Sequence, residues 1–286
     1  MTTGAGRVPR ALDLRKLRLG QVPMVLMYHG VEEVPLDPHK LCVTPAKFAE
    51  QMTWLAEHGL RGVSMGELLA AVRAGRERGL VGLTFDDGYL NVLDSAIPEL
   101  LHHGFTATMF IISGLLGKTN EWESEGTPIW RLMSAEQVAQ VAAAGMEIGS
   151  HSVTHPRLRG IGEERLRTEV AESRSSLGEL LGQPIEGFAY PFGSMDTAAR
   201  QAVRDAGYLY ATAVETPLTD LGIVALPRIV FHQNDGIGRL AVKRRFFRSY
   251  TAVRGTKRQL SYNQLAQHAK QGLSAVAHGA ASTVRH

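Results

Sequence analysis

Residues 80–88 read Leu80-Val81-Gly82-Leu83-Thr84-Phe85-Asp86-Asp87-Gly88. An apolar run that ends in two carboxylates and a glycine predicts a buried strand followed by a tight turn, with Asp86 and Asp87 at its C-terminal end. Neighbouring strand residues point to opposite faces, but a turn can bring both carboxylates toward one pocket. Two buried carboxylates cannot both stay ionised at low cost without a positive partner. We therefore expect a cation beside them, and a metal ion is the simplest candidate.

Two histidines later in the chain are the best partners for that cation. His151 and His155 lie four residues apart, at the end of a short strand-like segment. Two neutral imidazoles and one carboxylate make a three-ligand site with open positions, which is typical of catalytic rather than structural zinc. We expect Asp87 to be the carboxylate ligand and Asp86 to act as the general base toward metal-bound water. The ligand atoms favour Zn²⁺, and Co²⁺, Ni²⁺ or Mn²⁺ would also fit.

The rest of the chain alternates between strand-like and helical segments about seven times. Strands are predicted over residues 22–28, 80–85, 106–112, 146–150, 185–190, 208–214 and 223–231. Helices are expected to start after Thr44, Ser64, Ser134 and Asp196, and a long helix is expected over 163–181. This alternation predicts a parallel sheet covered by helices, either a barrel or an open doubly wound sheet. Polar residues follow several different strands, which favours a barrel with its site at the C-terminal rim.

Composition and charge suggest three regions. The 286 residues are 44% hydrophobic and 21% charged, as in ordinary globular proteins, and the single Cys42 excludes an intrachain disulfide. Residues 239–286 contain ten Lys or Arg and no Asp or Glu, which leaves a net charge of −7 for residues 1–238. We predict a basic leader over 1–20, a domain over 21–238 and a partly helical or disordered basic tail over 239–286.

The basic tail has two interpretations. It is either a solvated segment or a patch that meets an anionic membrane surface or polymer. No nucleic-acid recognition motif accompanies the charge, so we expect no nucleic-acid partner.

The N-terminal segment is not predicted to be an export signal. Its apolar run over 22–28 is short, contains Pro23, lacks a small-residue cleavage site and ends at His29. No segment has the ~18 uninterrupted apolar residues that a membrane span needs. A cytoplasmic or peripherally membrane-associated protein is the resulting expectation.

Two motifs resemble those of a known family. Thr84-Phe85-Asp86-Asp87-Gly88 and His151-Ser152-x-x-His155-Pro156 are similar to the first two motifs of the polysaccharide deacetylases, the NodB-homology or carbohydrate esterase family 4 group. Within that family, the sequence most resembles the poly-N-acetylglucosamine deacetylases. The resemblance covers about residues 22 to 232. It implies a NodB-like distorted (β/α) barrel and metal-dependent removal of N-acetyl, sometimes O-acetyl, groups from sugars. By this resemblance Asp86 matches the base, and Asp87, His151 and His155 match the metal ligands.

The sequence departs from the third motif of that family. It usually carries an arginine that orients the catalytic acidic pair, and Ala189 occupies that position. We expect Arg228, in the last strand, to replace the arginine; the alternative is an ordinary surface arginine. Tyr190 and the turn that follows it are expected to face the substrate, with the backbone N–H of Phe192 stabilising the oxyanion.

The general acid has two candidates. The leaving amine must be protonated, and no clear copy of the family's late Leu-x-x-His motif is present. His29 follows the first predicted strand, as an early histidine does in poly-N-acetylglucosamine deacetylases, whereas His232 follows the last strand. We favour His29 over His232.

Three functions remain open from the sequence. The first is a metal-dependent deacetylase that releases acetate from N-acetylglucosamine-containing poly- or oligosaccharide. The second keeps the metal hydrolysis but acts on a small glycoconjugate or a non-sugar amide. The third is an inactive carbohydrate-binding module, against which the complete set of two acids and two histidines argues.

Overall fold

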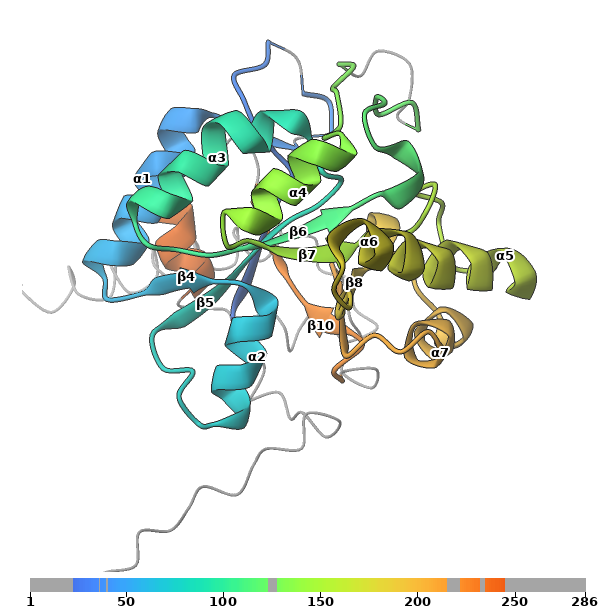
Figure 1. Cartoon of the computed structure of the whole chain (residues 1–286). Coiled ribbons are helices and arrows are strands. Elements are labelled where there is room, and N and C mark those ends of the chain that lie inside the picture. The colour runs from blue at the N-terminus through green and yellow to red at the C-terminus, as the bar shows by residue number, and fades with distance from the viewer. Residues whose placement is uncertain are drawn as a thin grey trace, which may run out of the picture.

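The computed structural model describes residues 23–35, 37–39, 41–122, 128–214, 222–231 and 235–244. Within them, nine strands form one parallel sheet, and helices pack around its outside (Figure 1). The predictions for residues 1–20, for His232 and for the tail beyond residue 244 lie outside the described residues.

The sheet follows the order β10-β9-β8-β7-β6-β5-β1-β11, with β4 paired beside β5. Its strands are β1 (Val25–Tyr28), β4 (Arg61–Val63), β5 (Leu80–Phe85), β6 (Thr108–Ile111), β7 (Glu147–Ser150), β8 (Gly187–Ala189), β9 (Tyr210–Ala213), β10 (Leu226–Pro227) and β11 (Ile229–Val230). A separate two-stranded sheet joins β2 (Gly30–Val31) and β3 (Cys42–Val43). Because all pairings in the large sheet are parallel, the C-terminal ends of its strands share one rim.

One segment of chain joins the two ends of the sheet. β10 pairs with β9, and β11 pairs with β1 on the opposite side. Only Arg228 separates the two strands, and its backbone N–H donates to the Ala213 carbonyl at 3.1 Å. Residues 226–230 therefore close the sheet into a barrel. The predicted distorted (β/α) barrel is confirmed, and the open doubly wound alternative is wrong. The strand predicted over 223–231 is the closing segment, interrupted at Arg228.

The helices surround the sheet, and side chains cap the N-termini of four of them. They are α1 (Pro45–Glu57), α2 (Met65–Arg73), α3 (Leu90–His102), α4 (Ala135–Ala143), α5 (Glu163–Arg167), α6 (Ser173–Leu181) and α7 (Thr197–Asp205), with short 3₁₀ turns η3 (Ser113–Leu115) and η5 (Pro191–Gly193). Thr44, Ser64, Ser134 and Asp196 each accept a backbone N–H at the predicted N-cap. Ser134 and Gln137 form a full capping box.

The long helix predicted over 163–181 contains a change of pitch. Between α5 and α6 the chain forms the π-helical segment η4 (Thr168–Glu172). Glu169 and Val170 are buried within it. A π turn widens the helix and changes which residues face the barrel, and such turns are frequent at functional sites.

The last described residues pack against the domain. Residues 237–244 are helical, and Leu240 is buried. The Lys243 ammonium donates to the Asp235 carboxylate and, at 2.6 Å, to the Val230 carbonyl. The first residues of the basic region that starts at 239 therefore form part of the folded body. In the described part of the chain, no helix has both the length and the apolar character to cross a membrane.

Candidate active site and metal centre

β5 delivers both carboxylates to the rim. Asp86 lies two residues beyond Thr84 and faces the same side of the sheet, and its N–H donates to the Tyr28 carbonyl at 3.0 Å. Asp87 would face the opposite side if the strand continued. Instead it adopts φ +70°, followed by Gly88 at φ +73°. This left-handed turn redirects the Asp87 carboxylate to the site, as the sequence predicted.

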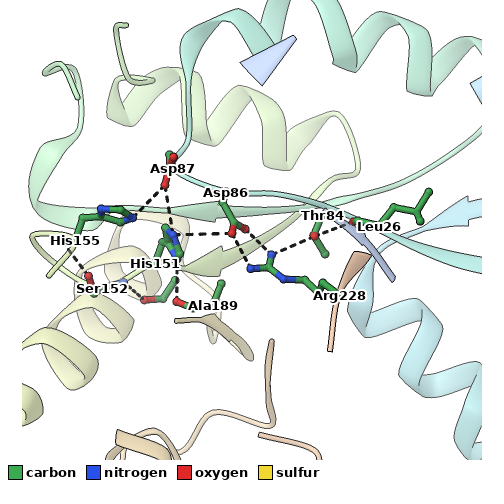
Figure 2. A network of polar contacts seen from close by, with 10 residues as sticks. Leu26, Thr84, Asp86, Asp87, His151, Ser152, His155, Ala189 and Arg228 are labelled. Carbon is green, nitrogen blue, oxygen red and sulfur yellow. Dashed lines mark hydrogen bonds and ion pairs between the residues drawn. The ribbon is translucent and has the colours of Figure 1, made fainter. Parts of the chain in front are cut away.

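Asp86 is paired with a buried arginine. Arg228 donates from its two terminal nitrogens to the two Asp86 oxygens, at 2.6 and 2.7 Å (Figure 2). The side chain also donates to the Thr84 hydroxyl at 3.2 Å, and the residue is only 1% exposed. This two-point geometry fixes both the charge and the orientation of Asp86. The surface-arginine alternative for Arg228 is therefore wrong.

Asp87 faces the two histidines. One Asp87 oxygen, Oδ1, lies 3.3 Å from His151 Nε2 and 3.3 Å from His155 Nε2 (Figure 2). The three possible ligand atoms lie within 4.8 Å of one another, and all three residues are buried. Ligands held at ~2.0–2.1 Å around a tetrahedral zinc ion would be about 3.3 Å apart. The cluster therefore has the spacing of a metal centre.

The second nitrogen of His151 sets its tautomer. Nδ1 lies 2.8 Å from the Ala189 carbonyl, which can only accept, so Nδ1 carries the proton. In a neutral imidazole, Nε2 is then a lone pair that faces the Asp87 oxygen. Two facing lone pairs repel unless a cation or a proton lies between them, and Asp87 Oδ1 is buried without a hydrogen bond. These features fit a divalent cation held by Asp87, His151 and His155.

The site's electrostatics point the same way. Burial raises the pKa of Asp86, but the Arg228 guanidinium and His151 outweigh burial and hold the pKa below its ordinary value. The pKa of Asp87 lies well below its usual range, because both imidazoles outweigh its burial. Burial lowers the pKa of His155 and of His29, whereas for His151 the two carboxylates outweigh burial and raise the pKa. The carboxylates thus favour an added proton on His151, and a bound cation would take the place of that proton.

Comparison with known proteins identifies the domain. Residues 73–211 match the family model described as polysaccharide deacetylase. The matched region contains Asp86, Asp87, His151 and His155, and it ends before Arg228. Residues 73–211 thus form a polysaccharide deacetylase domain. Deacetylases of this family are hydrolases that act on carbon–nitrogen bonds other than peptide bonds.

Relatives and solved structures agree with this family. YxkH of Bacillus subtilis, itself assigned to the polysaccharide deacetylases, is 27% identical over 210 residues, which cover 72% of this chain and 70% of YxkH. The poly-beta-1,6-N-acetyl-D-glucosamine N-deacetylase of Staphylococcus aureus is 22% identical over 60% of this chain and 61% of that protein. The structure of IcaB from Ammonifex degensii is 27% identical, with a TM-score of 0.64, over 77% of this chain and 96% of that one. The Streptococcus pyogenes deacetylase PplD, solved in complex with acetate, has a TM-score of 0.66 at 24% identity over 77% of this chain and 97% of that one, a likeness of fold.

The remaining predicted residues of the deacetylase domain occupy different surroundings. His29 follows β1 at the same level as Asp86, and its Nδ1 is buried without a hydrogen bond. Phe192 is 44% exposed at φ +56°, and its ring lies 4.5 Å from that of His155. Tyr190 is fully buried, and its hydroxyl donates to the Val224 carbonyl at 2.9 Å. Its side chain thus belongs to the core, and a substrate contact of Tyr190 stays a prediction.

Sequence reasoning missed one residue that contacts the loop between His151 and His155. Glu169 is buried, and its carboxylate accepts backbone N–H groups between the two histidines. It lies three residues after Leu166 and four before Ser173, both buried positions of the same helix. A carboxylate on the buried face of an amphipathic helix is a signal that the sequence offers.

The first prediction concerns the metal. The deacetylase domain is expected to hold one divalent cation, and Asp87→Ala, His151→Ala and His155→Ala should each weaken zinc binding by more than about 100-fold, because loss of an outer partner alone costs about 10–100-fold. Elemental analysis after gel filtration with a mild chelator measures this. His102→Ala, an exposed histidine on α3, is the matched control. Undiminished zinc in all three variants would contradict the assignment.

Proposed function

We propose that the protein is a metal-dependent deacetylase that hydrolyses N-acetyl groups of N-acetylglucosamine-containing poly- or oligosaccharides. The observation that carries the proposal is the pairing of two buried carboxylates with different partners: Asp86 with Arg228, and Asp87 with two imidazoles. A relative named as a poly-N-acetylglucosamine N-deacetylase supports this substrate class. Zn²⁺ suits the ligand set best, and Co²⁺, Ni²⁺ or Mn²⁺ would also fit it.

The roles of the chain's own groups follow from their positions. A divalent cation at Asp87, His151 and His155 would polarise the acetyl carbonyl and make water a better nucleophile. Asp86 accepts the proton of the attacking water, because each of its oxygens keeps a second lone pair beside the Arg228 bonds. Arg228 is a positioning residue that keeps Asp86 ionised and aimed.

The departing group needs a proton from elsewhere. As the carbon–nitrogen bond breaks, the amine nitrogen takes a proton from the His29 imidazolium, and acetate and the free amino sugar leave. Burial lowers the pKa of His29, whereas the nearby Asp87 and Asp86 carboxylates favour its imidazolium form, and an imidazolium of lowered pKa is a stronger acid toward the amine. In this proposal the backbone N–H of Phe192, the exposed residue of η5, stabilises the oxyanion, with a contribution of about 3 kcal/mol.

The function is tested by acetate release. We expect the zinc-loaded protein to release acetate from β-1,6-linked or β-1,4-linked N-acetylglucosamine oligomers, and Asp86→Asn to lose about 10²–10⁴-fold in kcat while keeping its zinc. Nucleotide-linked and lipid-linked N-acetyl sugars and a simple non-sugar amide are assayed in parallel. Acetate from these small substrates but not from oligomers would point to the small-substrate alternative. Release from none of them by a zinc-loaded protein would contradict the proposal.

Removal of the guanidinium should change both rate and pH dependence. Arg228→Lys keeps the charge but loses the two-point geometry, and we expect kcat/KM to fall about 100-fold, as for a misplaced catalytic group. In Arg228→Met, Asp86 stays buried but loses the positive charge that lowers its pKa, so its pKa rises. As the pH is lowered, the variant should therefore lose activity at a higher pH than the wild type does. Arg204→Lys, at an exposed position on α7, is the control. An unchanged kcat/KM and pH profile in both Arg228 variants would remove Arg228 from the mechanism.

His29 is tested by the choice of leaving group. His29→Ala should lose about 10²–10⁴-fold in kcat on N-acetyl substrates but keep most of its activity on an aryl acetate, because a phenolate leaves without protonation. Steady-state kinetics on the two substrate types give the ratio. Full amide activity in His29→Ala would show that this assignment is wrong, and His232→Ala would then be the next variant to compare.

A further inference from the structure

A buried carboxylate outside the metal cluster contacts the loop between the two histidines. Glu169 is 4% exposed. One of its oxygens, Oε2, accepts the N–H groups of Val153, at 3.0 Å, and of Thr154, at 2.8 Å. The other, Oε1, accepts the Thr154 hydroxyl. The carboxylate thus satisfies three donors from two consecutive residues of the segment that links His151 to His155.

That segment has an unusual backbone. Ser152 has φ +68° and His155 has φ +60°, both in the left-handed region that residues with a Cβ rarely adopt. The Ser152 hydroxyl accepts the N–H of His155 at 3.0 Å (Figure 2). A strained loop of this kind persists only when surrounding contacts hold it in place. The direction of the His155 imidazole therefore depends on what holds the loop.

The loop is held from two sides. On one side, the N–H groups of Ser113 and Gly114 donate to the carbonyls of Ser152 and Val153, at 3.1 and 3.0 Å. A methyl group on Gly114 would lie 2.7 Å from that Val153 carbonyl, so only glycine allows the close approach. On the other side, Glu169 takes the N–H groups. The loop's donors and acceptors thus have partners on η3 and η4.

The π-helical segment η4 places Glu169 at this point. One helical turn later, the Ser173 hydroxyl lies 2.5 Å from that of Ser150, the residue immediately before His151. The Tyr208 hydroxyl completes this contact, at 3.2 Å from Ser173. The same helix therefore anchors the segment before His151 and the segment between the two histidines.

We propose that Glu169 is a positioning residue of the metal centre, which fixes the His151–His155 loop so that both imidazoles meet Asp87 with the spacing of a bound cation. The inference rests on the metal centre of the proposed function. The competing account is that Glu169 serves folding alone. The two accounts differ in the affinity and the coordination of the metal, which a purely structural role would leave unchanged in the folded protein.

The experiment measures metal binding by the full chain. Zn²⁺ affinity is obtained by competition with a chromophoric chelator, the Co²⁺ absorption spectrum reports the coordination geometry, and the melting temperature of the metal-free protein reports folding. Glu169→Ala should bind Zn²⁺ about 10–100-fold more weakly than the wild type and show an altered Co²⁺ spectrum. Glu169→Gln and Thr154→Val, which keep most of the contacts, should lose less, and they carry the test if the alanine variant fails to fold.

Glu172→Gln is the matched control, because Glu172 is an exposed glutamate of the same π-helical segment. It should leave Zn²⁺ affinity and the Co²⁺ spectrum unchanged. If the wild type binds one Zn²⁺ and every folded Glu169 variant binds it equally well, with the same Co²⁺ spectrum and only a lower melting temperature, the positioning role is overturned while the metal centre stands. If the wild type binds no Zn²⁺, the metal centre itself fails, and this inference fails with it.

Discussion

The rim of the barrel is organised by a constraint on charge: two adjacent carboxylates are buried at the end of β5. Neither can stay ionised there at low cost without a positive partner. Asp86 takes a guanidinium from its own chain through two hydrogen bonds, whereas Asp87 faces two imidazoles at 3.3 Å in an arrangement that accommodates a cation. Because their partners differ, the two acids suit different tasks. Asp86 is fixed and anionic, whereas Asp87 has the surroundings of a metal ligand.

The partner of Asp86 belongs to the segment that closes the barrel. Arg228 stands between β10 and β11, where the chain leaves β9 and joins β1. Its backbone bonds to β9, and its side chain reaches Asp86 at the end of β5. β1 lies between β5 and β11, so the guanidinium reaches past one strand inside the barrel. Closure of the sheet and neutralisation of Asp86 are therefore coupled, and a loosened closing segment would leave a buried carboxylate unpaired.

Local patterns predicted much of this, and the rest depends on long-range packing. The strand over 80–85 has its predicted bounds, and the N-caps at Thr44 and Ser134 form as expected, since capping is decided within four residues. Asp87 and the two histidines converge because parallel strand ends share a rim. The contacts of Glu169 were not predicted, because the π turn that aims it depends on packing against a loop about 15 residues away. The burial of the Tyr190 side chain likewise depends on Val224, more than 30 residues later in the chain.

The small side chain of Ala189 is compatible with an arginine supplied by another part of the barrel, Arg228. Ala189 pairs with Thr212, and Thr212 pairs with Leu226, so these side chains share one face of the sheet. Arg228 lies two residues beyond Leu226 and faces the same side, toward the barrel interior, where its guanidinium lies 5.6 Å from the Phe110 ring. A second guanidinium from position 189 would enter the same buried space beside Arg228. The two like charges would then share Asp86, since Asp87 faces the two histidines, and this would be strongly unfavourable. Alanine avoids that conflict, and the backbone carbonyl at 189 still orients His151. Within the described residues, the barrel thus pairs one buried arginine, from the segment between β10 and β11, with the buried Asp86 carboxylate.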